Sequence, residues 1–573
     1  MLSMLWSTLL ALAAAPLILL VRQLRRWQLG RRGVLELSLA HDGPRHAALD
    51  AIAGTAELLR AMTDDELLRA VVLKIRSPSL GWAAAQDLHD ALLTLRRKGK
   101  LVFVHLEQAG NQELLLASAA DRVWLTPAAD VFLVGVGAQL VFFGDALHRL
   151  GVDVQIEAAG TYKSFGESYS RGFASAANRE ATAALVEDLS AQLVERLASS
   201  RCLDPAAIRA LMARSPLSAE EVHAAGLVDG VGHADQAQDA LDELLGQKVH
   251  PVSFRRYARL LAVEHYLESV GRRGRHVAVV HLEGPVVHGA EPEGGGGLRI
   301  EADRVSPVLE QLREDEDVAA VVLFLDTPGG SALASDIIAR SVQRLGAAKP
   351  VVAVFANVSA SGGYYIGAPA AEIIAWPGTI TGSIGVVGGK VSWGRALGQL
   401  GVHAEPIVSS DSALLLSPWR SFRPEERARF RALLERTYDR FLRVVAAGRR
   451  RPVEAIAPHA EGRVWTGRQA LERGLVDRLG GLDDGLARAR VLAGMEPDTP
   501  AVHLRFPPPR FRVLTQLLGL RGAAAAPDLV DLALASLGVG GRRLQLLRRH
   551  PGQALTLLPW VVDGAGDQPP PLP

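Results

Sequence analysis

Two residues of this 573-residue chain, Ser361 and Lys163, could together attack a carbonyl group. Ser361 lies in the segment SASGG at 359–363, shortly after an apolar, β-branched run at 351–355. The run predicts a buried strand and the residues from Tyr364 onward predict a helix, so the serine falls at the turn between them. Unpaired backbone N–H groups and the helix dipole favour negative charge there, which suits a nucleophile whose attack creates an oxyanion. An ordinary N-cap serine before two flexible glycines would have the same sequence.

A serine is a weak nucleophile unless a base accepts its proton, and Lys163 is the candidate base. Neither the segment SASGG around Ser361 nor the segment TYKSFGE around Lys163 contains a histidine, the usual base. The chain has only seven lysines among its 63 basic residues, so each retained lysine stands out. A lysine can act as a base when burial lowers its pKa, whereas an arginine cannot, and serine–lysine pairs are a known variant of the catalytic triad. The alternative is a solvated lysine in the exposed turn TYKSFGE.

Two further turns could complete such a site. An oxyanion hole needs backbone N–H groups, and the candidates are those of Gly330, in the turn DTPGGS at 326–331, and of Gly362. Glycines let the backbone approach a substrate closely. Ser383, in the small-residue turn TGSIG at 381–385, could hydrogen-bond the lysine amine and orient it. Each of these turns, taken alone, is also compatible with a common tight loop.

These residues belong to a unit that occurs twice along the chain. Five landmarks recur in the same order at an offset of about 250 residues, among them AVVLKI at 70–75 with AVVLFL at 320–325, and AGLVD at 225–229 with RGLVD at 473–477. Strands alternate with helices in both copies, which predicts an α/β fold. The first copy has no serine at the place of Ser361 and the second has no lysine at the place of Lys163. We therefore expect the two copies to share one site.

Composition and repeats divide the chain into five segments. The first 21 residues carry no charged side chain and are followed by arginines, which predicts an uncleaved transmembrane helix, with a cleaved signal peptide as the alternative. We predict, in order, a transmembrane anchor at 1–21, a lysine-bearing copy at 31–247, a helical connection at 248–273, a serine-bearing copy at 274–494, and a partly disordered C-terminal extension at 495–573.

The composition also argues against several other kinds of protein. A net charge of +1 gives no sign of a nucleic-acid partner. The single cysteine, Cys202, excludes an intrachain disulfide and any metal site built from several cysteines. We expect neither a metal nor a cofactor.

Taken together, the motifs resemble those of the signal peptide peptidase A family in its long, duplicated form. Its members are membrane-anchored serine–lysine proteases with tandem Clp protease/crotonase-like domains. The resemblance covers roughly residues 1–495 and rests on TYKS at 161–164, PGGS at 328–331, SASGGYY at 359–365, TGSIG at 381–385, and GRVWTG with GLVD between 462 and 477.

The resemblance implies that Ser361 is the nucleophile, Lys163 the general base and Ser383 its helper. It also implies a homotetramer in the inner (cytoplasmic) membrane, with a periplasmic body that digests signal peptides or other hydrophobic peptides in an extended groove. Two features differ from the family. Its Asn-Ser-Pro-Gly-Gly reads DTPGG at 326–330 here, and the tail after about Gly494 has no counterpart. The arginines after Val21 would by themselves place the body in the cytoplasm.

Two functions of other classes compete with a protease. A catalytically silent scaffold would bind peptides or membrane proteins, and loss of the serine, the lysine or either Gly-Gly turn would have favoured it. A crotonase-like acyl-CoA enzyme would share the fold and the oxyanion hole without needing the serine–lysine pair.

Overall fold

The structure is a computed structural model that describes residues 2–29, 33–40, 55–76, 80–254, 256–258, 260–261, 264, 275–289, 298–410, 412–497, 499–505 and 555–557. The chain packs into two compact units. Residues 1–137, 187–274 and 563–573 form unit 1, and residues 138–186 and 275–562 form unit 2. The segment 138–186 therefore packs with residues of the predicted second copy, although the repeat places it in the first.

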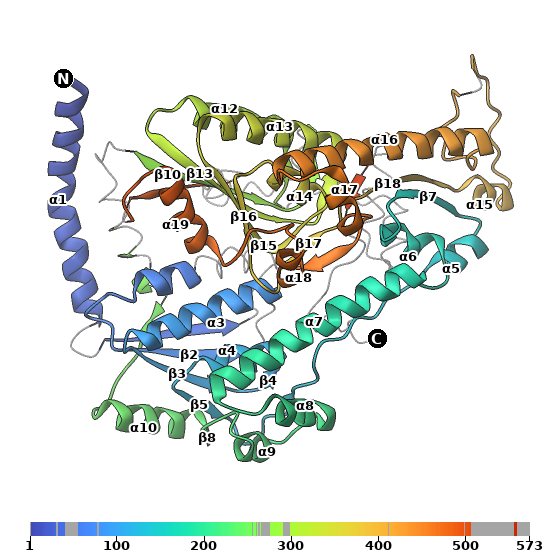
Figure 1. Cartoon of the computed structure of the whole chain (residues 1–573). Helices are drawn as coiled ribbons and strands as arrows, with labels where there is room; N and C mark the ends of the chain where they lie inside the picture. The colour runs from blue at the N-terminus through green and yellow to red at the C-terminus, as the bar shows by residue number, and fades with distance from the viewer. Residues whose placement is uncertain are drawn as a thin grey trace. The chain divides into compact units, whose positions relative to one another are not determined.

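Unit 1 is built on a parallel sheet with the strand order β8-β5-β3-β2-β1-β9 (Figure 1). Its strands are β1 (Val34–Ala40), β2 (Ala70–Arg76), β3 (Leu101–Leu106), β5 (Arg122–Leu125), β8 (Gly230–Val231) and β9 (Val252–Ser253). Its helices include α3 (Trp82–Arg97), α4 (Asn111–Ser118), α8 (Pro205–Arg214), α9 (Ala219–Ala224), α10 (Ala234–Leu245) and most of α7 (Ala176–Arg201).

Unit 2 contains an eight-stranded sheet whose parallel core, β20-β16-β15-β13-β10-β21, repeats the design of unit 1. The strands of this core are β10 (His276–Glu283), β13 (Val318–Thr327), β15 (Val351–Ala360), β16 (Glu372–Ala375), β20 (Arg478–Leu479) and β21 (Ala501–Arg505). Two further strands, β17 (Ile380–Gly382) and β19 (Val464–Thr466), extend the sheet from the end of β15. Its principal helices are α12 (Ala302–Glu314), α13 (Ala332–Ala348), α14 (Gly362–Gly367), α16 (Pro424–Gly448), α18 (Gly467–Glu472) and α19 (Leu482–Leu492). Because the strand order matches that of unit 1, the prediction of a duplicated α/β fold is confirmed.

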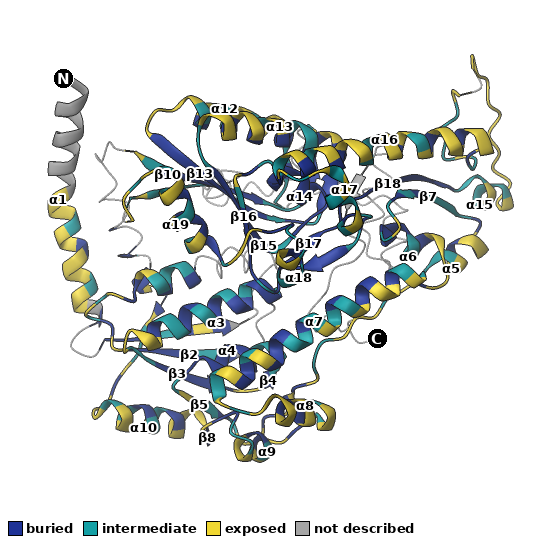
Figure 2. Ribbon diagram, in the orientation of Figure 1, coloured by how far each residue is buried: buried dark blue, intermediate teal, exposed yellow. Residues whose placement is uncertain are grey.

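The sheet of unit 2 is buried on both faces, as its unbroken apolar strands require (Figure 2). Successive side chains of a strand point to opposite faces. Val280, Leu323 and Ala353 contribute to the core on the side of α12 and α13. On the other side, a Cβ placed on Gly485 of α19 would lie 2.3 Å from Val354 Cγ2, so this helix packs directly on the sheet.

A smaller sheet in unit 2 has the order β12-β11-β14-β22-β18-β7. Its strands are β7 (Asp153–Ala159), β11 (Val286–Val287), β12 (Ile300–Glu301), β14 (Gly329–Ser331), β18 (Val386–Ser392) and β22 (Leu555–Leu557). Strand β7 comes from the segment 138–186 and pairs antiparallel with β18 along its whole length, from Val386↔Ala159 to Ser392↔Asp153. This pairing joins the segment that precedes Lys163 to the remainder of unit 2.

The predicted anchor lies in α1 (Leu2–Leu29), but the side chains of residues 1–14 fall outside the described part of the chain. Among the residues that the structure describes, no helix combines the length and the apolarity that a membrane crossing requires. The predicted helical connection at 248–273 contains the short strand β9 and is otherwise only partly described. Most of the extension at 495–573 lies outside the described residues.

Candidate active site

Strand β15 ends in a turn that presents Ser361 to the start of α14, as the sequence predicts. Ser361 has φ 57° and ψ −113°, a backbone conformation that L residues rarely adopt. Such a residue costs about 1–3 kcal/mol and persists only where its neighbours hold it in place. Here the Ser361 N–H donates to the Gly382 carbonyl at 2.8 Å, and its carbonyl accepts from the Tyr365 N–H at 2.9 Å. Strain held in this way is typical of functional sites.

Lys163 follows β7 and reaches the same point. Its Nζ lies 2.7 Å from Ser361 Oγ, 2.9 Å from Ser383 Oγ and 2.9 Å from the Ser383 carbonyl oxygen. Both serines are fully buried, and the lysine is 4% exposed. The structure thus brings together the three side chains that the sequence singles out, and all three belong to unit 2.

The three contacts of the lysine fit a neutral amine. Burial lowers the pKa of Lys163 well below its usual range, because a charged group loses its hydration there. A neutral amine has two N–H donors and one lone pair. The two oxygens of Ser383 can accept both N–H groups, which leaves the lone pair to accept the hydroxyl proton of Ser361. This arrangement is what a general base requires.

Ser383 is held by its own backbone. Its φ is 53°, and its N–H donates to the Arg463 carbonyl at 2.7 Å. Strand β17 (Ile380–Gly382) ends just before it and pairs with both β15 and β19 (Val464–Thr466). The serine that contacts the lysine is therefore fixed to the same sheet that carries Ser361.

The turn at 460–463 positions the lysine, a role that the sequence motifs do not reveal. The Tyr162 N–H donates to the Glu461 carbonyl at 2.7 Å, and the Thr161 N–H and hydroxyl both donate to Glu461 Oε2, at 2.9 and 3.0 Å. Gly462, at φ +75°, packs against the lysine backbone, and its N–H donates to the Ile384 carbonyl at 2.8 Å. The only sequence signal at this turn is that Gly462 opens GRVWTG, one of the motifs that carry the family resemblance.

Gly462→Ala should lower kcat by about 100-fold, because a displacement of about 1 Å at a reacting group can have an effect of this size. The new Cβ would lie 2.6 Å from Lys163 Cβ and 2.7 Å from its backbone nitrogen, so the lysine has to move. The matched control is Gly401→Ala, because Gly401 also has a positive φ, of +77°, but a Cβ added there would meet nothing within 4 Å. Steady-state kinetics and thermal unfolding of both variants separate a displaced lysine from general backbone strain. Equal losses of kcat in the two variants would contradict the positioning role.

The two glycine turns lie beside the serine. Gly362 is the first residue of α14, so its N–H has no partner within the helix. Gly330 lies in β14 opposite Val286 of β11, and a Cβ on it would lie only 2.0 Å from the Val286 carbonyl oxygen. Only glycine fits this close approach.

Asp326 and Thr327, which replace the family's Asn-Ser, both accept hydrogen bonds next to the glycine turn. The Asp326 carboxylate accepts the Val358 N–H at 3.0 Å and the Asn357 side-chain amide at 3.4 Å, which ties the end of β13 to the strand that carries Ser361. Thr327 Oγ1 accepts the Gly329 N–H at 3.1 Å. Burial raises the pKa of Asp326 to about 6. The change of residue types therefore keeps hydrogen-bond acceptors at the approach to Gly330.

Unit 1 contains a turn of the same kind without this chemistry. There β4 (Ala109–Gly110) leads into α4 and pairs with β6 (Val131–Phe132), as the end of β15 leads into α14 and pairs with β17. Asn111 stands at the start of α4. Its side-chain amide donates to the Gly135 carbonyl at 2.5 Å and accepts the Gly135 N–H at 3.1 Å. This turn thus presents a fixed amide in place of a nucleophile.

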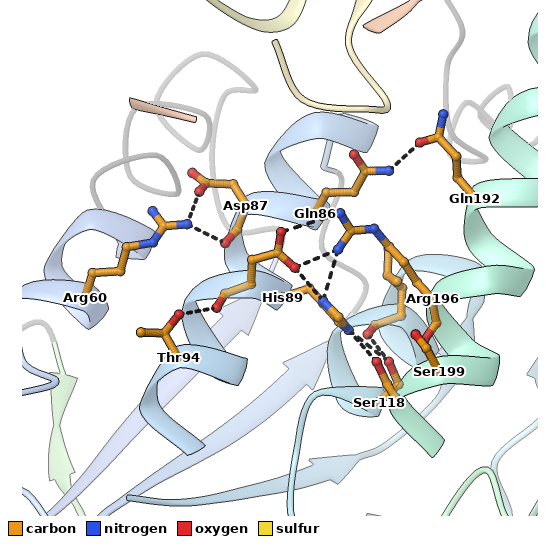
Figure 3. A network of polar contacts seen from close by, with 12 residues as sticks. Arg60, Gln86, Asp87, His89, Thr94, Ser118, Gln192, Arg196 and Ser199 are labelled. Atoms are coloured by element: carbon orange, nitrogen blue, oxygen red, sulfur yellow. Dashed lines mark hydrogen bonds and ion pairs between the residues drawn. The ribbon is translucent and has the colours of Figure 1, made fainter. Parts of the chain in front are cut away.

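Unit 1 also contains a serine, a histidine and an aspartate in contact (Figure 3). His89 Nε2 lies 3.3 Å from Ser118 Oγ, and His89 Nδ1 lies 3.1 Å from Asp90 Oδ1. However, His89 and Ser118 are each only 1% exposed, and the Ser118 hydroxyl donates to the Leu115 carbonyl at 2.7 Å. Arg196 of α7 also donates to Asp90 at 2.7 Å. Because the Ser118 hydroxyl donates its proton to the helix backbone and Asp90 is paired with Arg196, we assign the network to the packing of α3, α4 and α7.

In a comparison with known proteins, one family model matches part of each copy. The model described as "Peptidase family S49" matches residues 94–248 and 343–496. The chain is 29% identical over 436 residues to "Serine protease SPPA, chloroplastic" of Arabidopsis thaliana. The aligned region is 75% of this chain but only 64% of that protein. The chain is 31% identical over 451 residues to "Protease 4" of Salmonella typhi, and this aligned region is 76% of this chain and 71% of that protein. A solved structure of a ClpP1 variant from Listeria monocytogenes aligns with 36% of this chain and 94% of its own length, at 18% identity and a TM-score of 0.24.

Proposed function

The chain belongs to peptidase family S49 and is a serine protease, and we propose that Ser361 is its nucleophile and Lys163 its general base. The observation that carries the proposal is the distance of 2.7 Å between Lys163 Nζ and Ser361 Oγ inside a buried site. A nucleophile and a base within hydrogen-bond reach, with the base oriented by a third group, are the signature of an activated serine. Ser383 is the orienting group.

In the proposed reaction, the neutral Lys163 amine takes the hydroxyl proton as Ser361 Oγ attacks the carbonyl carbon of the peptide bond. The N–H groups of Gly330 and Gly362 stabilise the resulting oxyanion. The lysine then gives its proton to the leaving amine, which breaks the peptide bond and leaves an ester on Ser361. Water, activated by the same amine, hydrolyses this ester and restores the enzyme.

The substrate and location follow the family resemblance. We assign both copies to the Clp protease/crotonase-like fold and propose a homotetramer anchored by one membrane-spanning segment at 1–21, with its body in the periplasm. Its substrates would be signal peptides or other hydrophobic peptides. The uncharged, leucine- and alanine-rich stretch at the start of the chain supports the anchor. Protease added outside spheroplasts should degrade the body, and protection of the body would instead indicate a cytoplasmic side.

The test of the proposed chemistry is labelling with a fluorophosphonate, which reacts with activated serines. Peptide mapping of the labelled full-length chain should locate the adduct on Ser361, and Lys163→Ala should abolish labelling. An adduct on Ser118 would instead point to the histidine network of unit 1. Failure of the wild-type chain to react would favour the catalytically silent scaffold.

A further inference from the structure

Glu180, near the start of helix α7, joins two segments that lead to the candidate active site. Its Oε2 accepts the Tyr162 hydroxyl at 3.0 Å, and its Oε1 pairs with the Arg463 guanidinium. The guanidinium also lies over the Tyr162 ring, 4.7 Å from its centroid. The bonds from Arg463 and Tyr162 hold the pKa of Glu180 below its usual range, so the acceptor is a carboxylate at neutral pH.

Both partners of Glu180 are tied to the reacting groups. Tyr162 directly precedes Lys163 in the chain. The Arg463 carbonyl accepts the Ser383 N–H at 2.7 Å, and the two oxygens of Ser383 lie 2.9 Å from Lys163 Nζ. The contacts therefore close a ring: the amine binds Ser383, Ser383 binds the Arg463 backbone, and the Arg463 side chain returns through Glu180 to the residue before the lysine.

The start of α7 is itself fastened to the segment that carries the lysine. Helix α6 (Glu167–Ser170) begins four residues after Lys163. Glu167 Oε2 accepts the Ser175 N–H at 2.9 Å and the Asn178 side-chain amide at 3.1 Å. Ser175 Oγ in turn accepts the Asn178 N–H at 3.1 Å, which satisfies one of the free donors of the first turn of α7. Glu180 is therefore presented by a helix whose beginning has a fixed place.

We propose that Glu180 is a positioning residue for the catalytic pair, an inference that rests on the proposed function. It acts through Tyr162 and Arg463 rather than on the reacting atoms. By holding these two residues together, it keeps the oxygens of Ser383 on the two N–H groups of the amine, so that the lone pair faces the nucleophile. Without the carboxylate, the Tyr162 hydroxyl loses its acceptor and the guanidinium loses its counter-charge, and the ring of contacts is open.

The test is Glu180→Ala, which removes the carboxylate from a helix at no cost in helix propensity. We expect kcat to fall about 10-fold with KM unchanged, since a displacement of about 1 Å at a reacting group can lower the rate about 100-fold and the ring is opened at only one point. The rate should also begin to fall at a higher pH on acidification, because a loosened site admits water, which stabilises the charged amine.

The matched control is Glu187→Ala, on the same helix. Glu187 is exposed, and among the residues that the structure describes its side chain makes no hydrogen bond or ion pair. This variant should keep the kcat and the pH profile of wild type. Thermal unfolding of both variants shows whether a lower kcat reflects lost stability.

A double-mutant cycle with Tyr162→Phe tests the route through the tyrosine. Tyr162→Phe alone should lower kcat and shift the pH profile in the same direction, and the double variant should be no slower than Glu180→Ala. An unchanged kcat and pH profile in Glu180→Ala, a change confined to KM, or additive losses in the cycle would each overturn the proposal. Ser361→Ala, assayed in parallel, tests the proposed function separately: if it still hydrolyses the peptide, the assignment of the nucleophile is wrong whatever the result for Glu180.

Discussion

Replacing Ser361 with alanine should lower kcat by about 10⁴-fold or more, because losing a catalytic nucleophile removes the covalent pathway altogether. The fold should persist, since the change deletes one hydroxyl from a turn whose backbone is held by Gly382 and Tyr365. The measurement is steady-state hydrolysis of a hydrophobic peptide, with thermal unfolding as the check on folding.

The matched control for this variant lies two residues away. Ser359 is also fully buried, and among the described residues its hydroxyl has no hydrogen-bond partner. Ser359→Ala should therefore keep kcat close to that of wild type. Retention of more than about one hundredth of the wild-type kcat in Ser361→Ala would remove the serine from the mechanism, because loss of a nucleophile typically has a far larger effect.

Lys163→Arg should be as inactive as Lys163→Ala, although it keeps the positive charge. Arginine stays protonated at any working pH and so cannot accept the serine proton. The guanidinium is also too large for a site in which Nζ already contacts three oxygens of two buried serines. Lys98→Arg is the control, because Lys98 lies at the surface and pairs with Asp64 at 2.9 Å. A fully active Lys163→Arg enzyme would rule out the dyad.

The same assignment fixes the sign of the pH dependence. Burial lowers the pKa of Lys163, and only the neutral amine is a base. The wild-type rate should therefore fall as the pH is lowered through this pKa and level off above it. The pH profile of kcat/KM measures the pKa of this lysine in the free enzyme. A rate that rises on acidification would indicate a different base.

The sequence was sufficient to find the reacting groups because each carries its own local signal. The apolar run and the two glycines place Ser361 at a strand-to-helix turn, and the structure has that turn. The scarcity of lysine was a less specific guide. Lys390 is also buried, yet its amine donates to the Leu415 carbonyl at 2.8 Å and lies over the Phe422 ring. The scarcity of lysine therefore does not by itself identify a base, since Lys98 is exposed and the buried Lys390 is held by a carbonyl oxygen. The neighbours of a buried lysine decide whether it can be a base.

The features that sequence reasoning missed depend on contacts between distant segments. Gly462 matters because its turn packs on a loop some 300 residues earlier, as the contact between Thr161 and Glu461 shows. The association of the segment 138–186 with unit 2 depends on the pairing of β7 with β18, and the position of β22 depends on its pairing with β14 and β18. None of these pairings leaves a pattern in the local sequence, because a strand's partner is set by the whole sheet.

The pairing of β7 with β18 also has a consequence for biosynthesis. Lys163 and Ser361 are 198 residues apart, so at about 5–20 residues per second the ribosome needs about 10–40 s to pass from one to the other. Until β18 has been made, β7 has no neighbour in the sheet and the lysine remains hydrated with an ordinary, protonated amine. A nascent chain therefore has no working base, and it cannot digest its surroundings before its second half is complete.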